Sequence, residues 1–254
     1  MKKIIQYIIL TAVRDWLFLG LLLAVFGVFG VSNLLGYTAL VEESAIQTTI
    51  FAGICRLILI IGMVVFICFR ISQSFENKEI PFILAKNISR EKFVFSYWLG
   101  FNIVAQLLLI PVILILLIFS KMNMHGALQW FVSVSFELMI MTTFSIAISL
   151  IIKISVFSVF VCFAFYTISR MMNFFTNSKV SMIENQYLSK MMEISQYILN
   201  YISSIIPRLD LFGQTRWLTY GGNKETMIII CAQLLIYVPL LFLVAFYDFD
   251  KKQF

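Results

Sequence analysis

Charged residues are scarce in this chain. Asp, Glu, Lys and Arg together make up 13% of the 254 residues, whereas the hydrophobic fraction is 61%. Soluble domains carry roughly 25% charged residues, so the composition excludes an ordinary water-soluble protein. At about 20 residues for each membrane-crossing helix, most of the chain is needed for spans. The composition therefore predicts an all-α, polytopic integral membrane protein.

The residues and motifs of most enzymes are also missing. No G-x-x-x-x-G-K-[ST] motif is present to hold ATP phosphates, and the single histidine, His125, has no Cys, Asp or Glu beside it. The four cysteines lie in apolar runs without CxxC spacing, which indicates buried thiols rather than disulfides or metal ligands. We expect no catalytic residue, metal site or cofactor in this chain. An intramembrane enzyme would need polar partners that meet only in the folded chain.

Apolar runs predict six membrane spans. Their ranges are 17–36, 48–69, 93–120, 128–152, 154–175 and 226–247. The first 16 residues begin like a signal peptide, with two lysines before an apolar run. Arg14 and Asp15 stand where a small-residue cleavage site would be, so we expect an uncleaved helix that lies in the membrane interface.

Basic residues indicate how the chain is oriented. Lys and Arg near span ends resist translocation, and six spans place both termini on one side. With the termini inside, the cytosolic basic residues are Lys2, Lys3, Arg14, Arg70, Lys78, Lys86, Arg90, Lys92, Lys153, Lys251 and Lys252. The outside then holds Lys121 and the basic residues of the long segment 177–224, where the charge rule is weak. We therefore expect both termini to be cytoplasmic in a bacterial plasma or inner membrane. The net charge of +6 is spread over the loops, which suits anionic lipid and not nucleic acid.

Two polar segments have an amphipathic character of their own. The cytosolic segment 70–92 mixes both charges with an apolar set that a merely solvated connector would not need. We expect it to contact a cytosolic partner, and a plain connector is the alternative. In the external segment 177–224, apolar residues recur every three or four positions from 180 to 206, which predicts an interfacial helix. Pro207 is expected to end it, with a turn region following.

The expected spans contain five polar residues of interest, which are Arg56, Asn102, Gln106, Glu137 and Arg170. Counted inward from their outer boundaries, Arg56 and Glu137 lie at matching depths of about 12–14 Å. Charges in spans face the bundle interior or one another, so we predict an ion pair between spans two and four. The alternative is that Arg56 reaches the surface alone and Glu137 is protonated. The Ser and Thr residues of span four, and three glycines of span one, indicate close helix packing.

The arrangement of these features resembles that of the ABC-2 type permeases, the membrane subunits of ABC transporters. The resemblance covers almost all of residues 1–254 as a single transmembrane domain. Its sharpest part is Glu-Asn-Lys-Glu-Ile at 76–80, followed by Leu84, Ile-Ser-Arg at 88–90, Phe93 and Trp-Leu-Gly at 98–100. The run Pro-Arg-Leu-Asp-Leu-Phe at 207–212, with Trp-Leu at 217–218, is also similar to subgroups of the family. The family often has a glycine where this chain has Lys78 or Ile80.

The resemblance implies a coupling helix that docks on a cytosolic ATPase. The residues it assigns to this role are Glu76, Lys78, Glu79, Ile80, Phe82, Ile83, Leu84, Lys86 and Arg90. It further implies a permease subunit, mostly found in exporters, that works as a dimer with a second copy or a related permease. A separate dimeric ATPase subunit would bind ATP and magnesium. We expect an amphipathic or lipid-like substrate; the alternative function is a non-transporting scaffold that relays ATPase motion to an external partner.

Overall fold

The computed structural model describes residues 2–38, 42–79, 89–119, 123–177 and 206–251, and these residues are almost entirely helical, with no strand among them. Six of the helices are long and apolar enough to cross a membrane. They are α2 (Trp16–Tyr37), α3 (Glu43–Glu76), α5 (Arg90–Phe119), α6 (Met124–Ile151), α7 (Ser155–Asn177) and α10 (Lys224–Lys251). Each covers most of one predicted span, and the predicted all-α polytopic fold is confirmed.

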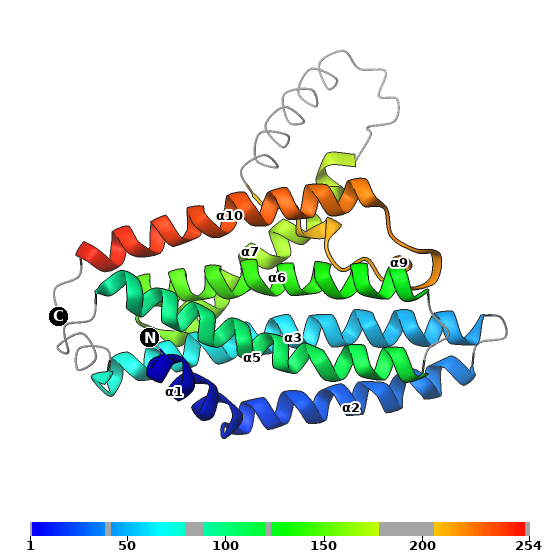
Figure 1. The fold of residues 1–254 in the computed structure, drawn as a ribbon, viewed down its shortest axis with the longest axis horizontal. Helices are drawn as coiled ribbons and strands as arrows, with labels where there is room; N and C mark the ends of the chain where they lie inside the picture. The colour runs from blue at the N-terminus through cyan, green and yellow to red at the C-terminus, as the bar shows by residue number, and fades with distance from the viewer. Residues whose placement is uncertain (1, 39–41, 80–88, 120–122, 178–205, 252–254) are drawn as a thin grey trace, which may run out of the picture.

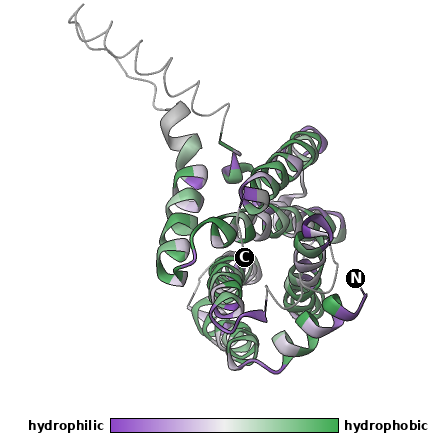
Figure 2. Ribbon diagram, turned by 90° about the vertical axis from the view of Figure 1, so that its left-hand side faces the viewer, coloured by the Kyte–Doolittle hydropathy of each residue, from purple (hydrophilic) through white to green (hydrophobic). Residues whose placement is uncertain are grey.

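Helices α2, α3, α5, α6 and α10 run along the long axis of the molecule, whereas α7 is inclined to them (Figure 1). Hydrophobic residues cover most of each helix (Figure 2). One end of the bundle, here called the proximal end, holds α1 (Lys2–Val13), the end of α3, the start of α5 and the end of α10 (Figure 1). The distal end holds the end of α2, the start of α3, the end of α5, the start of α6 and α9 (Arg216–Tyr220) (Figure 1). The termini therefore share one end, as an even number of spans requires.

Helix α1 lies obliquely across the proximal end and packs on α5. Its Ile8 and Ala12 are buried, and a side chain on Gly100 of α5 would come within 3.0 Å of Ile8. The chain turns sharply after α1, because the carboxylate of Asp15 accepts a hydrogen bond from the Leu17 backbone N–H (3.0 Å) and so caps α2.

Helix α6 forms the centre of the bundle. It packs against α3, α5, α7, α9 and α10 and is buried along most of its length, including Trp130 and Leu138. Several hydroxyl side chains bond back to their own helix, as Thr143 does to the Met139 carbonyl oxygen (2.6 Å) and Ser145 to that of Met141 (2.7 Å). These two side chains are paired within the helix and let neighbouring backbones approach, which agrees with the packing role expected for them.

Helices α2 and α10 lie at the outside of the bundle and expose large apolar side chains. Leu23 of α2 is 70% exposed and Leu235 of α10 is 73% exposed, as expected of surfaces that face lipid. A side chain on Gly20, Gly27 or Gly30 would meet no atom within 4 Å. These glycines therefore do not make the close helix packing expected of them within the described part of the chain.

The structure corrects the predicted boundary between the second span, 48–69, and the polar segment 70–92. Helix α3 does not end at Phe69 but continues to Glu76. Ile71 and Ser74 remain buried there, so packing extends the helix beyond the last apolar run of the sequence. The segment 70–92 is thus helical at both ends, up to Glu76 and again from Arg90. Residues 80–88 between these ends lie outside the described part.

A second correction concerns residues 206–223, which the sequence suggests are a simple external turn region. They include the 3-10 helix η1 (Leu209–Leu211) and α9, and they fold back onto the distal end of the bundle. Leu209, Phe212, Trp217 and Leu218 are all buried there. The polar groups that this segment reaches, described below, explain why it enters the bundle. The helix predicted for 180–206 lies almost wholly outside the described residues.

Candidate functional site

A buried ion pair joins α3 to α6 in the distal half of the bundle. Arg56 donates from Nε to Glu137 Oε2 (2.7 Å) and from Nη2 to Glu137 Oε1 (2.6 Å). The two residues are only 3% and 0% exposed. This two-pronged geometry matches the fork of a guanidinium to a carboxylate, which is the strongest form of such a contact. The ion pair predicted from matching depths is confirmed.

Arg170 of α7 brings a second guanidinium to the same carboxylate. Its Nη1 lies 3.9 Å from Glu137 Oε1, too far for a direct hydrogen bond. The same nitrogen donates to the backbone carbonyl oxygens of Leu209 (2.6 Å) and Phe212 (3.1 Å). Glu137 is therefore shared between two cations. Residues 206–223, here called the distal segment, supply backbone carbonyls as the further acceptors that these cations need.

The distal segment also completes the hydrogen bonding of Arg56. Arg56 Nη1 donates to the Gly213 carbonyl oxygen (3.0 Å), while the Gly213 N–H donates to Ser133 Oγ on α6 (2.9 Å). Gly213 has φ +53°, and a Cβ there would lie 2.7 Å from Arg56 Nε. Only glycine suits this position, because it tolerates the left-handed backbone and leaves room for the guanidinium.

What we call the buried cluster therefore consists of the buried side chains of Arg56, Ser133 and Glu137, the partly exposed Arg170 and the backbone of residues 209–213. It connects α3, α6 and α7 to the segment that folds back over them. Sequence analysis identified its three charged members but not Ser133 or Gly213. The signal in the sequence was the glycine directly after the Leu-Asp-Leu-Phe run, since a turn residue there allows a backbone carbonyl to face inward.

Helix α9 fastens the distal segment to the start of α6. The Asn123 N–H donates to the Leu218 carbonyl oxygen (3.1 Å), and Trp217 is 2% exposed. A Cβ on Gly126 would collide with the Trp217 carbonyl oxygen. This close approach of two backbones is possible only because residue 126 has no side chain.

Asn102 and Gln106 do not join the buried cluster. They lie on α5 and form a polar seam with another face of α6. Ser135 donates to Gln106 Oε1 (2.9 Å) and Thr142 donates to Asn102 Oδ1 (3.1 Å). The seam continues with Trp98, whose indole N–H donates to the Thr143 hydroxyl (2.8 Å). The five polar residues singled out in the sequence thus divide into a charged cluster and a neutral seam that holds α5 to α6.

The described residues among those expected to couple to an ATPase lie at the proximal end, and two of them bond to the chain itself. Glu79 accepts from the Tyr7 hydroxyl of α1 (3.4 Å) and from the Ser74 hydroxyl (3.2 Å). Arg90 donates to the Phe249 carbonyl oxygen of α10 (2.7 Å). The base of the α3–α5 connection is thereby tied to the first and last helices of the chain.

Lys78 is one of two non-glycine residues with positive φ in the described part (φ 55°). It directly follows the residue that caps the end of α3, where the left-handed conformation favours glycine. Glu76 is exposed on the last turn of α3. The other residues assigned to coupling, Ile80, Phe82, Ile83, Leu84 and Lys86, lie outside the described residues.

No family model matches this chain, and a search of curated proteins finds no relative of it. Within the described residues, the charged cluster of Arg56, Glu137 and Arg170 is suited to holding α3, α6 and α7 in one relative position. It brings together no group of three or more metal-ligating side chains there.

Proposed function

We propose that this chain is the membrane-spanning permease subunit of an ATP-driven transporter of the ABC-2 type, and that it exports an amphipathic or lipid-like substrate. ATP hydrolysis, with its magnesium ion, takes place on a separate cytosolic ATPase subunit that acts as a dimer. The permease pairs with a second copy of itself or with a related permease, and membrane lipid surrounds it. Both termini are in the cytoplasm.

The observation that carries this proposal is the length of the α3–α5 hairpin. Helix α3 has 34 residues and α5 has 30, whereas about 20 residues suffice to cross a bilayer. At about 1.5 Å per residue, α3 is roughly 50 Å long, so it must extend beyond the hydrocarbon core. The end of α3 at Glu76 and the start of α5 at Arg90 both lie at the end of the bundle that holds α1 and the end of α10. That is where an ATPase would dock.

The buried cluster fits a membrane protein that changes conformation. The pair between Arg56 and Glu137 holds α3 and α6 together. Arg170 of α7 lies 3.9 Å from the same carboxylate and can serve as an alternative partner for it. In the proposed cycle the Arg56–Glu137 pair holds one state and breaks in the other, while Arg170 keeps Glu137 from being left unpaired. Charges inside spans are expensive and usually serve such functions.

The test is to look for an ABC ATPase in the neighbouring reading frames and to reconstitute the chain into vesicles with it. If the chain is a permease, amphipathic solutes will stimulate ATP hydrolysis and a labelled solute will cross the membrane. A relay scaffold would instead hydrolyse ATP with no solute movement, and stimulation would require an external protein. Absence of any complex between the two proteins would overturn the proposal.

A further inference from the structure

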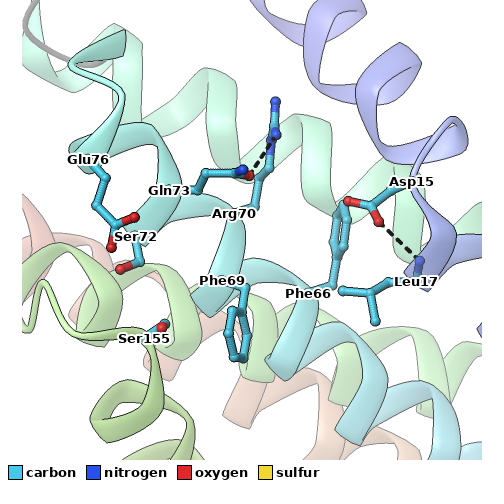
Figure 3. Close-up of a pocket in the computed structure, with 9 residues that line it drawn as sticks. All are labelled: Asp15, Leu17, Phe66, Phe69, Arg70, Ser72, Gln73, Glu76 and Ser155. Atoms are coloured by element: carbon cyan, nitrogen blue, oxygen red, sulfur yellow. Dashed lines mark hydrogen bonds between the residues drawn. The ribbon is translucent and has the colours of Figure 1, made fainter.

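A cavity of about 380 Å³ lies at the proximal end of the bundle, between α2, α3 and the start of α7 (Figure 3). Its volume falls within the range of small-molecule sites, roughly 300–1,000 Å³. Its charged side chains are Asp15, Arg70 and Glu76, and its aromatic ones are Phe66 and Phe69. None of these residues belongs to the buried cluster in the distal half. The cavity is therefore a separate site.

Opposite charges line this cavity without pairing. Figure 3 shows the Arg70 side chain between those of Asp15 and Glu76, yet within the described residues no salt bridge joins Arg70 to either carboxylate. Arg70 donates instead to Gln73 Oε1 (3.2 Å) and to the Tyr7 hydroxyl (3.3 Å). A guanidinium has five N–H donors, so these two bonds leave others for a ligand. The Asp15 carboxylate is held in place by the cap that it forms on α2.

The remaining walls fit an amphiphile. Phe66 is buried, while Phe69 is 46% exposed. Ser155 of the lining begins α7, and the start of a long helix favours an anion through its unpaired N–H groups. A cationic group thus has two carboxylates, an anionic group has Arg70 and the start of α7, and an apolar chain has Phe69 and Leu17.

We propose that this cavity binds the headgroup of a phospholipid that carries both an ammonium and a phosphate group, as phosphatidylethanolamine does. The ammonium lies against one of the two carboxylates that flank Arg70, the phosphate lies against Arg70, and the acyl chains leave past Phe69. Such a headgroup supplies at once the two charges that the cavity walls hold apart. The inference goes beyond the proposed function, because a lipid can reside here whether or not the protein transports one.

The test is native mass spectrometry of the purified full-length chain titrated with phosphatidylethanolamine or phosphatidylglycerol, which share a phosphate but differ in the ammonium. The chain should retain phosphatidylethanolamine preferentially. The double variant Asp15→Asn, Glu76→Gln should weaken that binding about five- to tenfold, because two charged hydrogen-bond acceptors become neutral. Binding of phosphatidylglycerol should not weaken. Asn also caps helices, so α2 should stay intact.

Matched variants separate the cavity from general surface charge. Glu91→Gln removes an exposed carboxylate near the start of α5 that does not line the cavity, and it should leave lipid binding unchanged. Arg70→Gln should weaken the binding of both lipids, whereas Arg14→Gln, at an exposed position, should weaken the binding of neither. The unfolding temperature of each variant, measured alongside, confirms that it is folded.

Three results would overturn the inference. The first is a preference for phosphatidylglycerol in the unsubstituted protein. The second is equal phosphatidylethanolamine binding by the double variant and by Glu91→Gln. The third concerns phosphoethanolamine, which has the headgroup without acyl chains and should bind far more weakly than the lipid. Equal binding of the two would show that the ligand is a soluble molecule and not a lipid. A failed transport assay leaves these binding results intact, so the two proposals can fail separately.

Discussion

Arg56 and Glu137 are 81 positions apart in the chain and meet through two hydrogen bonds in the interior of the bundle. Because they belong to α3 and α6, their contact fixes the depth of one helix against the other. Arg170 and the carbonyl of Gly213 surround the same pair. The predictions below begin with this cluster.

Glu137→Leu should destabilise the protein by about 3–5 kcal/mol, because it leaves Arg56 buried without a carboxylate. Arg56→Leu should destabilise it less, because Arg170 remains near Glu137. The double change should recover part of the loss. Recovery stays incomplete, since the Gly213 carbonyl still loses its donor and Arg170 loses its nearby carboxylate. Thermal unfolding of the detergent-solubilised protein measures all three. Strictly additive losses would show that the two side chains are not coupled.

Arg170→Leu should loosen the distal segment more than the bundle. Hydrogen bonds from a charged donor contribute about 1.5–3 kcal/mol each, and Arg170 donates to two carbonyls of this segment. Hydrogen exchange at residues 209–213 should therefore become at least about tenfold faster. Arg216→Leu is the matched control, because Arg216 is exposed and bonds only to Gln214 within the described residues. Equal effects of both changes would contradict the role assigned to Arg170.

Gly126→Ala should lower the unfolding temperature, because the new methyl group would collide with the backbone of Trp217. Overpacking of this kind costs about 1–3 kcal/mol, and a backbone atom cannot rotate away as a flexible side chain can. The control is Gly20→Ala on α2, where a Cβ meets nothing within 4 Å. That change should be neutral or slightly stabilising, since alanine favours helix. A tolerated Gly126→Ala would mean that α9 is not held against α6.

The apolar residues of segment 80–84 should bind the ATPase subunit. Ile83→Asp should abolish co-purification of the ATPase while leaving membrane insertion intact, because a charge replaces an apolar contact in a loop outside the spans. Ile83→Val keeps the apolar character and should preserve the complex. Undiminished co-purification with Ile83→Asp would refute the docking site.

Residues 180–206 are predicted to form a helix parallel to the outer membrane surface. Single cysteines placed along this segment should react with an aqueous thiol reagent at a period of about 3.6 residues. The apolar face should be protected by lipid. Uniform reaction along the whole segment would indicate an external loop without helical structure.

The membrane class, the six spans and the contact between Arg56 and Glu137 could all be predicted from the sequence. Each follows from the free-energy cost of placing polar groups in hydrocarbon. That cost depends on residue type and depth, and both can be read by counting residues along the chain. The end of α3 could not be placed in this way. The sequence shows where apolar residues stop, but Ile71 and Ser74 are kept helical by neighbours that are distant in the chain.

Tertiary structure alone decided what completes the buried cluster. The glycine after the Leu-Asp-Leu-Phe run indicates a turn within residues 206–223, but the local pattern does not show that this turn folds back into the bundle. The difference lies in acceptors offered by backbone carbonyls, which every residue has and which only the fold can aim at Arg56 and Arg170. The proximal cavity has the same origin. Asp15 caps the start of α2 and Arg70 belongs to α3, and packing alone places their opposite charges around one space while holding them apart.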